Sequence, residues 1–150
     1  MNTWILVADA CGARLFLTFD NGKSLHLLER FSHSQSRAME AELVSERPGS
    51  ARSSTHSMPS SKQPHRTHKE LEAVEFATVL NDYLVDAVQQ QKFESLVLVA
   101  PPHFLGLLRA ELSPALARKI SATVAKELIY MDESIIREHV VQAVWPARRS

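Results

Sequence analysis

The side chains of this 150-residue sequence that could do chemistry gather in one polar stretch, residues 45–68. From position 47 to position 68 the chain reads RPGSARSSTHSMPSSKQPHRTH, with four arginine or lysine residues and no acid. Such a run can neutralise phosphate charges, so it predicts a surface for RNA. A solvated loop without a partner is the alternative. The residues expected to contact RNA are Arg47, Arg52, Lys62, Gln63, His65, Arg66, His68 and Lys69.

This stretch is longer than the connections that compact domains ordinarily tolerate, and we expect it to form a long, mobile loop. Its histidines offer an H-x-x-H spacing at His65 and His68, with His56 nearby. Zinc requires further ligands, and the stretch has no cysteine to supply one. We therefore expect neither a metal nor a cofactor.

Asp9 ends the first apolar run of the chain, where ribonuclease H-like nucleases place a metal-binding carboxylate. The second acid that such enzymes need is missing, because the corresponding later run ends in Ala100-Pro101. We expect Asp9 to cap the turn that follows it, with a divergent nuclease as the alternative. Glutamates of a predicted helix could add carboxylates, although helices of this kind routinely carry solvated acids; they are Glu70, Glu72 and Glu75.

A block of prolines and glycine, residues 101–109, follows the apolar run 95–100. Ligands of open α/β sheets bind at such places, but Pro101 and Pro102 remove two amide donors that an anion would use. A packing role is favoured, in which the prolines fix the chain direction and Gly106 lets a helix approach the sheet. Arg109 is then expected to pair with an acid such as Glu111 or Glu133.

The elements that must position these groups begin with three strands. Apolar runs predict strands over 4–9, 14–19 and 25–31, and Asn21-Gly22 is a strong hairpin signal between the last two. Consecutive strands joined by tight turns form an antiparallel meander.

Helices and parallel strands follow in the second half of the chain. Apolar residues at three- and four-residue spacing predict a helix over 70–91, and the unbroken run 95–100 predicts a buried parallel strand. Pro102 and Pro114 can each begin a helix. We expect another strand near 128–130 and a last helix over 132–144.

This order predicts a single α/β domain over residues 1–150, built on a mixed sheet with helices on both faces. Right-handed crossovers give the strand order 3-2-1-4-5, the topology of ribonuclease H-like folds. Cys11 is the only cysteine and cannot form an internal disulfide, which suits a reducing compartment. The apolar run at the start is interrupted by Asp9 and Arg14, so it predicts neither a signal peptide nor a membrane span. We therefore expect a cytoplasmic protein without a membrane partner. The chain has 17 lysine and arginine residues and 17 aspartate and glutamate residues, so its formal net charge is zero. An RNA partner therefore requires a local basic patch.

Several motifs together resemble the bacterial host-attachment protein family. They are WILVAD at 4–9 followed by Gly12-Ala13-Arg14, ERPG at 46–49, APPHFLGLLR at 100–109 and KEL at 126–128. The resemblance spans nearly the whole chain in the right order. It implies that a family motif or pocket includes Asp9, Arg14, Pro48, Gly49, Pro101, Pro102, Gly106 and Arg109.

The host-attachment family is similar in turn to the central domain of eukaryotic and archaeal peptide-chain release factors. Those relatives carry a Gly-Gly-Gln tripeptide on the loop before the long helix, and it coordinates ester hydrolysis. The equivalent stretch 47–68 has no Gly-Gly-Gln, and Gln63 is flanked by lysine and proline. The likeness thus implies the fold without the complete catalytic set.

We accordingly expect a release-factor-like module that binds ribosome or tRNA through the basic loop, and not an enzyme. One alternative is a hydrolase acting on an ester such as peptidyl-tRNA, or a divergent nuclease that uses Asp9. Another is an adaptor that affects attachment to host cells. The sequence leaves the oligomeric state open.

Overall fold

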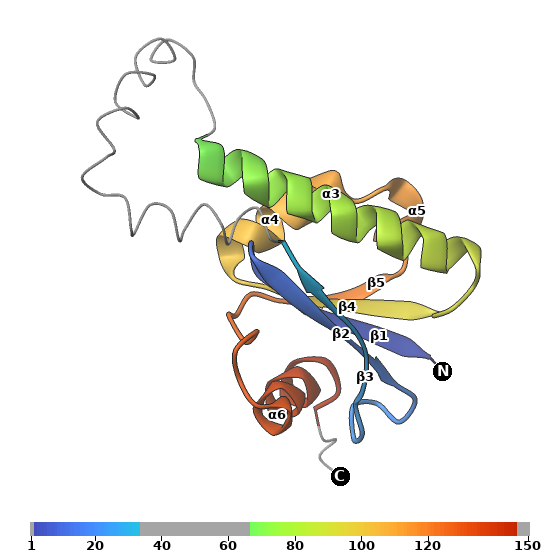
Figure 1. The fold of residues 1–150 in the computed structure, drawn as a ribbon. Coiled ribbons are helices and arrows are strands. Elements are labelled where there is room, and N and C mark those ends of the chain that lie inside the picture. The colour runs from blue at the N-terminus through green and yellow to red at the C-terminus, as the bar shows by residue number, and fades with distance from the viewer. Residues whose placement is uncertain (1, 34–66, 147–150) are drawn as a thin grey trace, which may run out of the picture.

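Strand β1 (Thr3–Ala8) lies at the centre of the sheet, and all six of its residues are buried. The computed structural model describes residues 2–33 and 67–146 (Figure 1). In it β1 pairs antiparallel with β2 (Gly12–Thr18) and parallel with β4 (Ser95–Val99). The edges are β3 (His26–Ser32) and β5 (Ile120–Val124), so the order is β3-β2-β1-β4-β5, as predicted.

The first helical layer packs on one face of the sheet and holds the larger core. It contains α3 (His68–Gln89), α4 (Pro102–Glu111) and α5 (Pro114–Ala117). Thr67 begins α3 with a reciprocal capping box, in which its hydroxyl accepts from the Glu70 amide at 3.1 Å. Phe76, Leu80 and Leu84 then bury one stripe of α3 among the even-numbered residues of β1.

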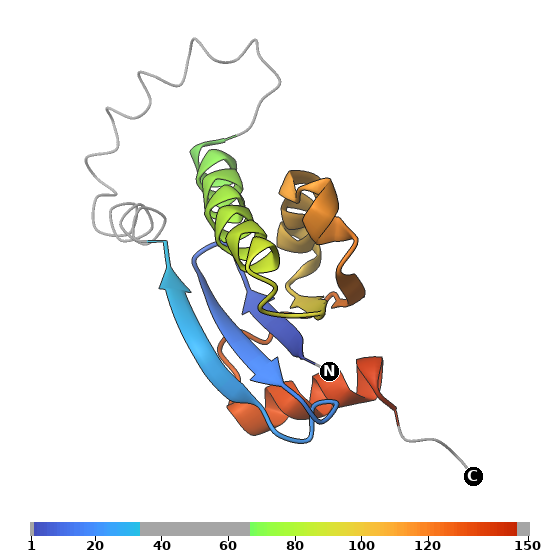
Figure 2. The same cartoon turned by 90° about the vertical axis from the view of Figure 1, so that its right-hand side faces the viewer.

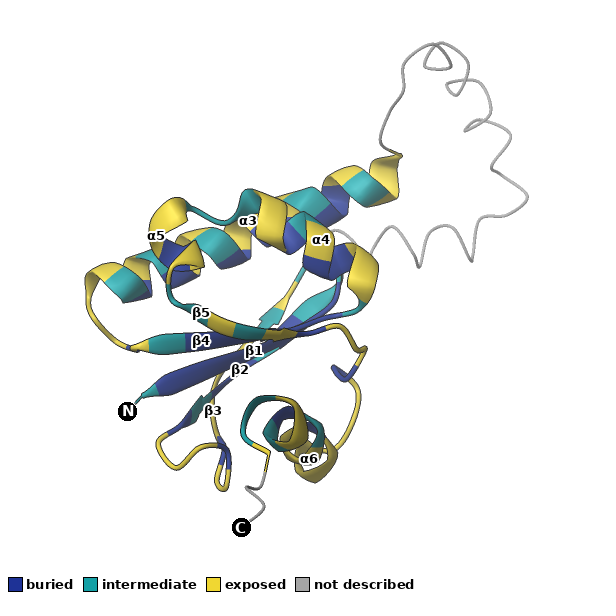
Figure 3. Cartoon of the chain, turned by 180° about the vertical axis from the view of Figure 1, so that it is seen from behind, coloured by how far each residue is buried: buried dark blue, intermediate teal, exposed yellow. Residues whose placement is uncertain are grey.

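The second layer is α6 (Glu133–Val144), which covers the opposite face, as Figure 2 shows. Its buried Ile136 and Val140 pack in the same core as Ile5 and Val7, the odd-numbered residues of β1. Alternating side chains of β1 therefore contribute to two cores, and the central strands β1 and β4 form a buried layer between the helices (Figure 3). The prediction of helices on both faces is confirmed. Within the ranges described, no helix is long and apolar enough to span a bilayer.

The Asn21-Gly22 signal is confirmed by the backbone between β2 and β3. Asn21 has φ 57° and Gly22 has φ 86°, the left-handed region that this dipeptide tolerates best. The Gly22 amide donates to the Thr18 hydroxyl at 2.9 Å. A Cβ on Gly22 would lie 2.7 Å from Val141 Cγ2, so the turn packs tightly against α6.

The strand predicted over 128–130 is wrong, because the fifth strand is Ile120–Val124. As an edge strand that pairs only with β4, it needs little hydrophobicity, and its small and β-branched residues suffice. Leu128 and Ile129 are apolar for a different reason. They lie in the connection to α6 and fill the second core.

The close approach expected at Gly106 is also wrong. Phe104, Leu105 and Leu108 are the residues of α4 that face the core, which leaves Gly106 on the exposed side of the helix. A Cβ built there meets nothing within 4 Å. Packing of α4 on the sheet therefore does not require this glycine.

We expect Gly106→Ala to stabilise the protein by about 0.5–1 kcal/mol, because alanine lowers the entropy that a helix interior loses on folding. Gly22→Ala should destabilise it by more than about 1 kcal/mol, since both the positive φ and the Val141 contact oppose a side chain. Urea unfolding of the two variants beside the parent measures both. A decrease in the stability of Gly106→Ala would contradict this account of α4.

Candidate functional site

The carboxyl ends of four strands, β1, β3, β4 and β5, lie at one edge of the sheet. β1 and β4 run parallel, and β3 runs the same way because β2 is antiparallel to both β1 and β3. Asp9 follows β1, His33 follows β3 and Pro101 lies beyond β4. The first turns of α3 and α4 begin at the same edge (Figure 1). Ligands of open α/β sheets bind at this carboxyl edge.

Asp9 shapes the backbone of this edge. Its Oδ1 accepts from the Cys11 amide at 2.9 Å and from the Gly12 amide at 3.0 Å. The Cys11 carbonyl in turn accepts from the His33 amide at 3.0 Å, which fixes the end of β3 beside the turn. Asp9 thus caps the turn, as expected from the sequence. Cys11 itself is half-buried, and Gly12 starts β2.

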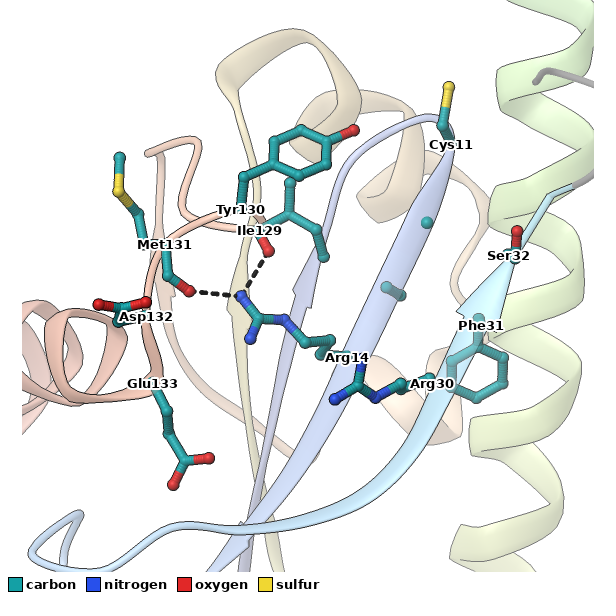
Figure 4. Close-up of a pocket in the computed structure, with 12 residues that line it drawn as sticks. Cys11, Arg14, Arg30, Phe31, Ser32, Ile129, Tyr130, Met131, Asp132 and Glu133 are labelled. Carbon is teal, nitrogen blue, oxygen red and sulfur yellow. Dashed lines mark hydrogen bonds between the residues drawn. The ribbon is translucent and has the colours of Figure 1, made fainter.

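A cavity of about 620 Å³ opens beside this turn, on the sheet face that α6 only partly covers (Figure 4). Arg14 on β2 and Arg30 on β3 are direct cross-strand partners, so both side chains project from the same face. The remaining lining residues are Cys11, Gly12, Ala13, Phe31, Ser32, Ile129, Tyr130, Met131, Asp132 and Glu133.

Arg14 is held in place by the connection before α6. Its Nη2 donates to the Met131 carbonyl at 2.8 Å and also to the Ile129 carbonyl (Figure 4). The guanidinium carbon lies 5.8 Å from the centre of the Phe16 ring. These two bonds use one terminal nitrogen, and the other nitrogens of a guanidinium carry further N–H donors that can be directed at a ligand.

Two guanidinium groups in one cavity repel each other. Burial lowers the pKa of Arg14, and the neighbouring charge of Arg30 lowers it further, while Glu133 and Asp132 act in the opposite direction. Like charges directly opposite on paired strands are unfavourable. An anion bound between the arginines would relieve that repulsion.

Tyr130 forms the exposed rim of the cavity, with 76% of its surface accessible. The negative charge of Asp9 is the main cause that raises the pKa of Tyr130, followed by burial and by a side-chain hydrogen bond with Asp9. The Asp9 carboxylate therefore lies close enough to the phenol to act on its charge.

A second cluster lies at the same edge, between the end of β3 and the first turns of α3. His33 Nε2 is 3.1 Å from Glu72 Oε1 and 3.7 Å from Glu75 Oε1. The expectation of solvated helix acids holds for Glu75 but is wrong for Glu72, which is buried. The cause is His33, which directly follows β3 and covers this face of α3. Glu70 lies 3.7 Å from His103 of α4.

Four of the remaining predicted site residues lie at this edge. His68 and Lys69 are exposed in the first turn of α3, and Pro101 and Pro102 begin α4 as expected. Arg109 is exposed and, among the described residues, makes no ion pair with Glu111 or Glu133. That expected pairing is wrong, because Glu133 belongs to α6 on the other face of the sheet (Figure 2). Arg47, Pro48, Gly49, Arg52, His56, Lys62, Gln63, His65 and Arg66 lie outside the described residues.

His33 and Arg30 are site residues that sequence reasoning missed. Neither belongs to a motif, since Arg30 lies on an edge strand whose residues are mostly exposed and His33 comes directly after that strand. The register of β3 on β2 is the only signal that places Arg30 opposite Arg14. His33 could be found only from the direction of β3, which returns the chain to the edge where α3 begins.

A family model described as "Protein required for attachment to host cells" matches residues 4–140. The chain belongs to this family. It is also 32% identical over 69 residues to an uncharacterized protein of Rickettsia prowazekii (strain Madrid E). That match covers 45% of this chain and 46% of the relative, so the chain spans about half the length of the curated relative it matches. The host-attachment resemblance is thus confirmed, while the likeness to release factors, the RNA partner and the cytoplasmic location stay predictions.

We expect Asp9→Asn to lower the pKa of Tyr130 toward the usual value of tyrosine, about 10, because the substitution removes the negative charge beside the phenol. Asparagine keeps the carbonyl oxygen that caps the turn, so the backbone should be preserved. Ultraviolet titration of tyrosinate in a Tyr83→Phe background measures Tyr130 alone. An unchanged titration would show that Asp9 and the phenol do not interact in solution.

Proposed function

We propose that this host-attachment family protein binds RNA, with the Arg14–Arg30 cavity gripping backbone phosphate and the basic stretch 47–69 extending the contact. The observation that carries the proposal is the cross-strand pair of arginines in an open cavity. The proposed partner is a ribosome or a tRNA, bound without hydrolysis, as in a release-factor-like module that lacks the catalytic tripeptide.

The chemistry of the pair suits phosphate. A guanidinium presents its donors in a planar fork that matches two phosphate oxygens, and Arg14 is already oriented by the carbonyls of Ile129 and Met131. Orientation before binding reduces the side-chain entropy that binding costs. Asp132 and Glu133 balance part of the arginine charge in the absence of RNA.

The surroundings of the cavity add to this support. Tyr130 is an exposed aromatic ring at the rim, suited to stacking on an unpaired base. The stretch 34–66 follows His33 and returns at Thr67, and both of these residues lie at the same edge of the sheet as the cavity. The two described residues that flank the segment with the four basic residues between 47 and 66 thus both lie at this edge.

The hydrogen bonds of the Asp9 carboxylate favour binding over catalysis. A nuclease would use its carboxylate for metal ions, whereas Oδ1 of Asp9 here receives two backbone amides. A role of the protein in attachment to host cells would then be indirect, through RNA or translation. If the protein binds no RNA, a direct role in adhesion to host cells becomes the alternative function.

The test is binding of the purified protein to labelled tRNA and its cosedimentation with ribosomes, each at low and at moderate salt. We expect salt-sensitive binding that weakens in Arg30→Ala and weakens further in Arg14→Ala/Arg30→Ala. The slope of log affinity against log salt should fall by about 1 for each phosphate that the variant no longer neutralises. Arg52→Ala/Lys62→Ala/Arg66→Ala should show the same change for the basic stretch.

The matched control is Arg118→Ala/Lys119→Ala, which removes the same charge at the opposite end of the sheet, before β5 begins. This variant should bind almost as the parent does. Equal weakening in the control and in the Arg14/Arg30 variant would reduce the effect to overall charge and contradict a specific cavity. Arg30 is exposed, so its single substitution tests the cavity while the bonds from Arg14 to the backbone remain.

A further inference from the structure

The His33, Glu72 and Glu75 side chains form a cluster with the donor types and spacing of a metal site. The three donor atoms, Nε2 and the two carboxylate oxygens, all lie within 4.8 Å of one another. We propose that this cluster binds one divalent transition-metal ion, with Zn²⁺ as the best fit. The proposal is independent of RNA binding and of the arginine cavity.

The distances fit the coordination geometry of zinc. Zn²⁺ bonds to imidazole nitrogen and carboxylate oxygen at about 2.0–2.2 Å, so neighbouring ligand atoms of a tetrahedral site lie roughly 3.3–3.6 Å apart. The His33 Nε2 distances of 3.1 Å to Glu72 and 3.7 Å to Glu75 lie on either side of that range. The two carboxylate oxygens lie within 4.8 Å of each other, and the exposed side chain of Glu75 can adjust to complete the three-ligand set.

Two of the three ligands, His33 and Glu72, are held in place before any ion binds. The His33 ring stacks on Phe76, with ring centres 5.2 Å apart and an interplanar angle of 20°. Only 12% of the His33 side chain and 11% of the Glu72 side chain are exposed. Glu72 and Glu75 are three residues apart on α3, so both carboxylates project from one face of the helix.

The electrostatics of the cluster also favour a cation. A neutral imidazole has one N–H, which lies on Nε2 or on Nδ1, so Nε2 can donate to at most one carboxylate at a time. A dication would bind the Nε2 lone pair and balance both carboxylate charges at once. Glu75 is the exposed ligand, with 56% of its side chain accessible, and this side leaves room for water as the fourth ligand.

The donor set selects among metals. Imidazole together with carboxylates suits Zn²⁺ and other first-row transition metals, whereas Mg²⁺ prefers oxygen ligands and keeps its water.

The consequence of metal binding follows from the positions of the ligands in the sequence. His33 and Glu72 are 39 positions apart and flank residues 34–66, so the ion would fasten together the two ends of that segment. It would also tie the edge strand β3 to α3.

The experiment is calorimetric titration of the chelator-treated full-length chain with ZnCl₂ and, separately, with MgCl₂. We expect one Zn²⁺ per chain at this site, a rise in melting temperature with Zn²⁺, and far weaker binding of Mg²⁺. Glu75→Gln should weaken Zn²⁺ binding at least about tenfold, since removal of even an outer-shell partner costs 10–100-fold. Glu75 is exposed, so this variant should fold normally.

Two controls separate this site from other metal-binding side chains. Glu138→Gln makes the same chemical change at an exposed glutamate of α6, and His103→Gln removes an exposed imidazole outside the cluster. Both should bind Zn²⁺ as the parent does. Imidazole nitrogen NMR reports the ligand directly, because Zn²⁺ should shift Nε2 of His33, and His33→Gln assigns that resonance.

Three results would overturn the proposal. The first is no measurable Zn²⁺ binding, which would leave His33 with Glu72 and Glu75 as ion pairs alone. The second is equal affinity in Glu75→Gln and in the parent. The third is Zn²⁺ binding that leaves the His33 resonance unmoved, which would place the metal on other histidines of the chain.

Discussion

Burial of β1 on both faces is the constraint on which the rest of this structure depends. A strand without a wet face can exist only between two covering layers, and this chain builds those layers from α3, α4 and α5 on one side and α6 on the other. The parallel pairing of β1 with β4 requires a crossover, which α3 supplies. The same crossover brings the first turn of α3 to the carboxyl edge, where the polar residues gather.

The two proposed sites are alike in that both depend on the edge strand β3. Its register against β2 sets Arg30 opposite Arg14, and the hydrogen bond just beyond its end, from the His33 amide to the Cys11 carbonyl, holds His33 near Glu72. Edge strands are usually short of contacts and tolerant of change. Here the exposed strand β3 places Arg30 in the cavity, and His33 directly after it contacts α3. The contribution of β3 to the two proposed sites therefore comes from these side chains and not from core packing.

The sequence predicts the elements of this fold well where each has one dominant cause. The unbroken run of β1, the Asn21-Gly22 turn and the prolines at α4 and α5 each have a single physical reason, and each prediction is confirmed. Predictions that depend on contacts between residues far apart in the sequence are wrong or were not made. Leu128 and Ile129 are apolar because α6 covers them, not because they form a strand. Gly106 lies in a motif but faces solvent, and Glu72, the buried partner of His33, comes 39 positions later in the chain.

The order of β1 and α6 along the chain shapes how the protein is made. Ile5 and Val7 are synthesised long before Ile136 and Val140, the residues that cover them. The second core therefore cannot close until α6 has left the ribosome, and the β1–β3 meander keeps an apolar face uncovered until then. Contacts so distant in sequence also slow folding. A nascent chain of this protein thus has a long exposure to chaperones and to self-association before α6 arrives.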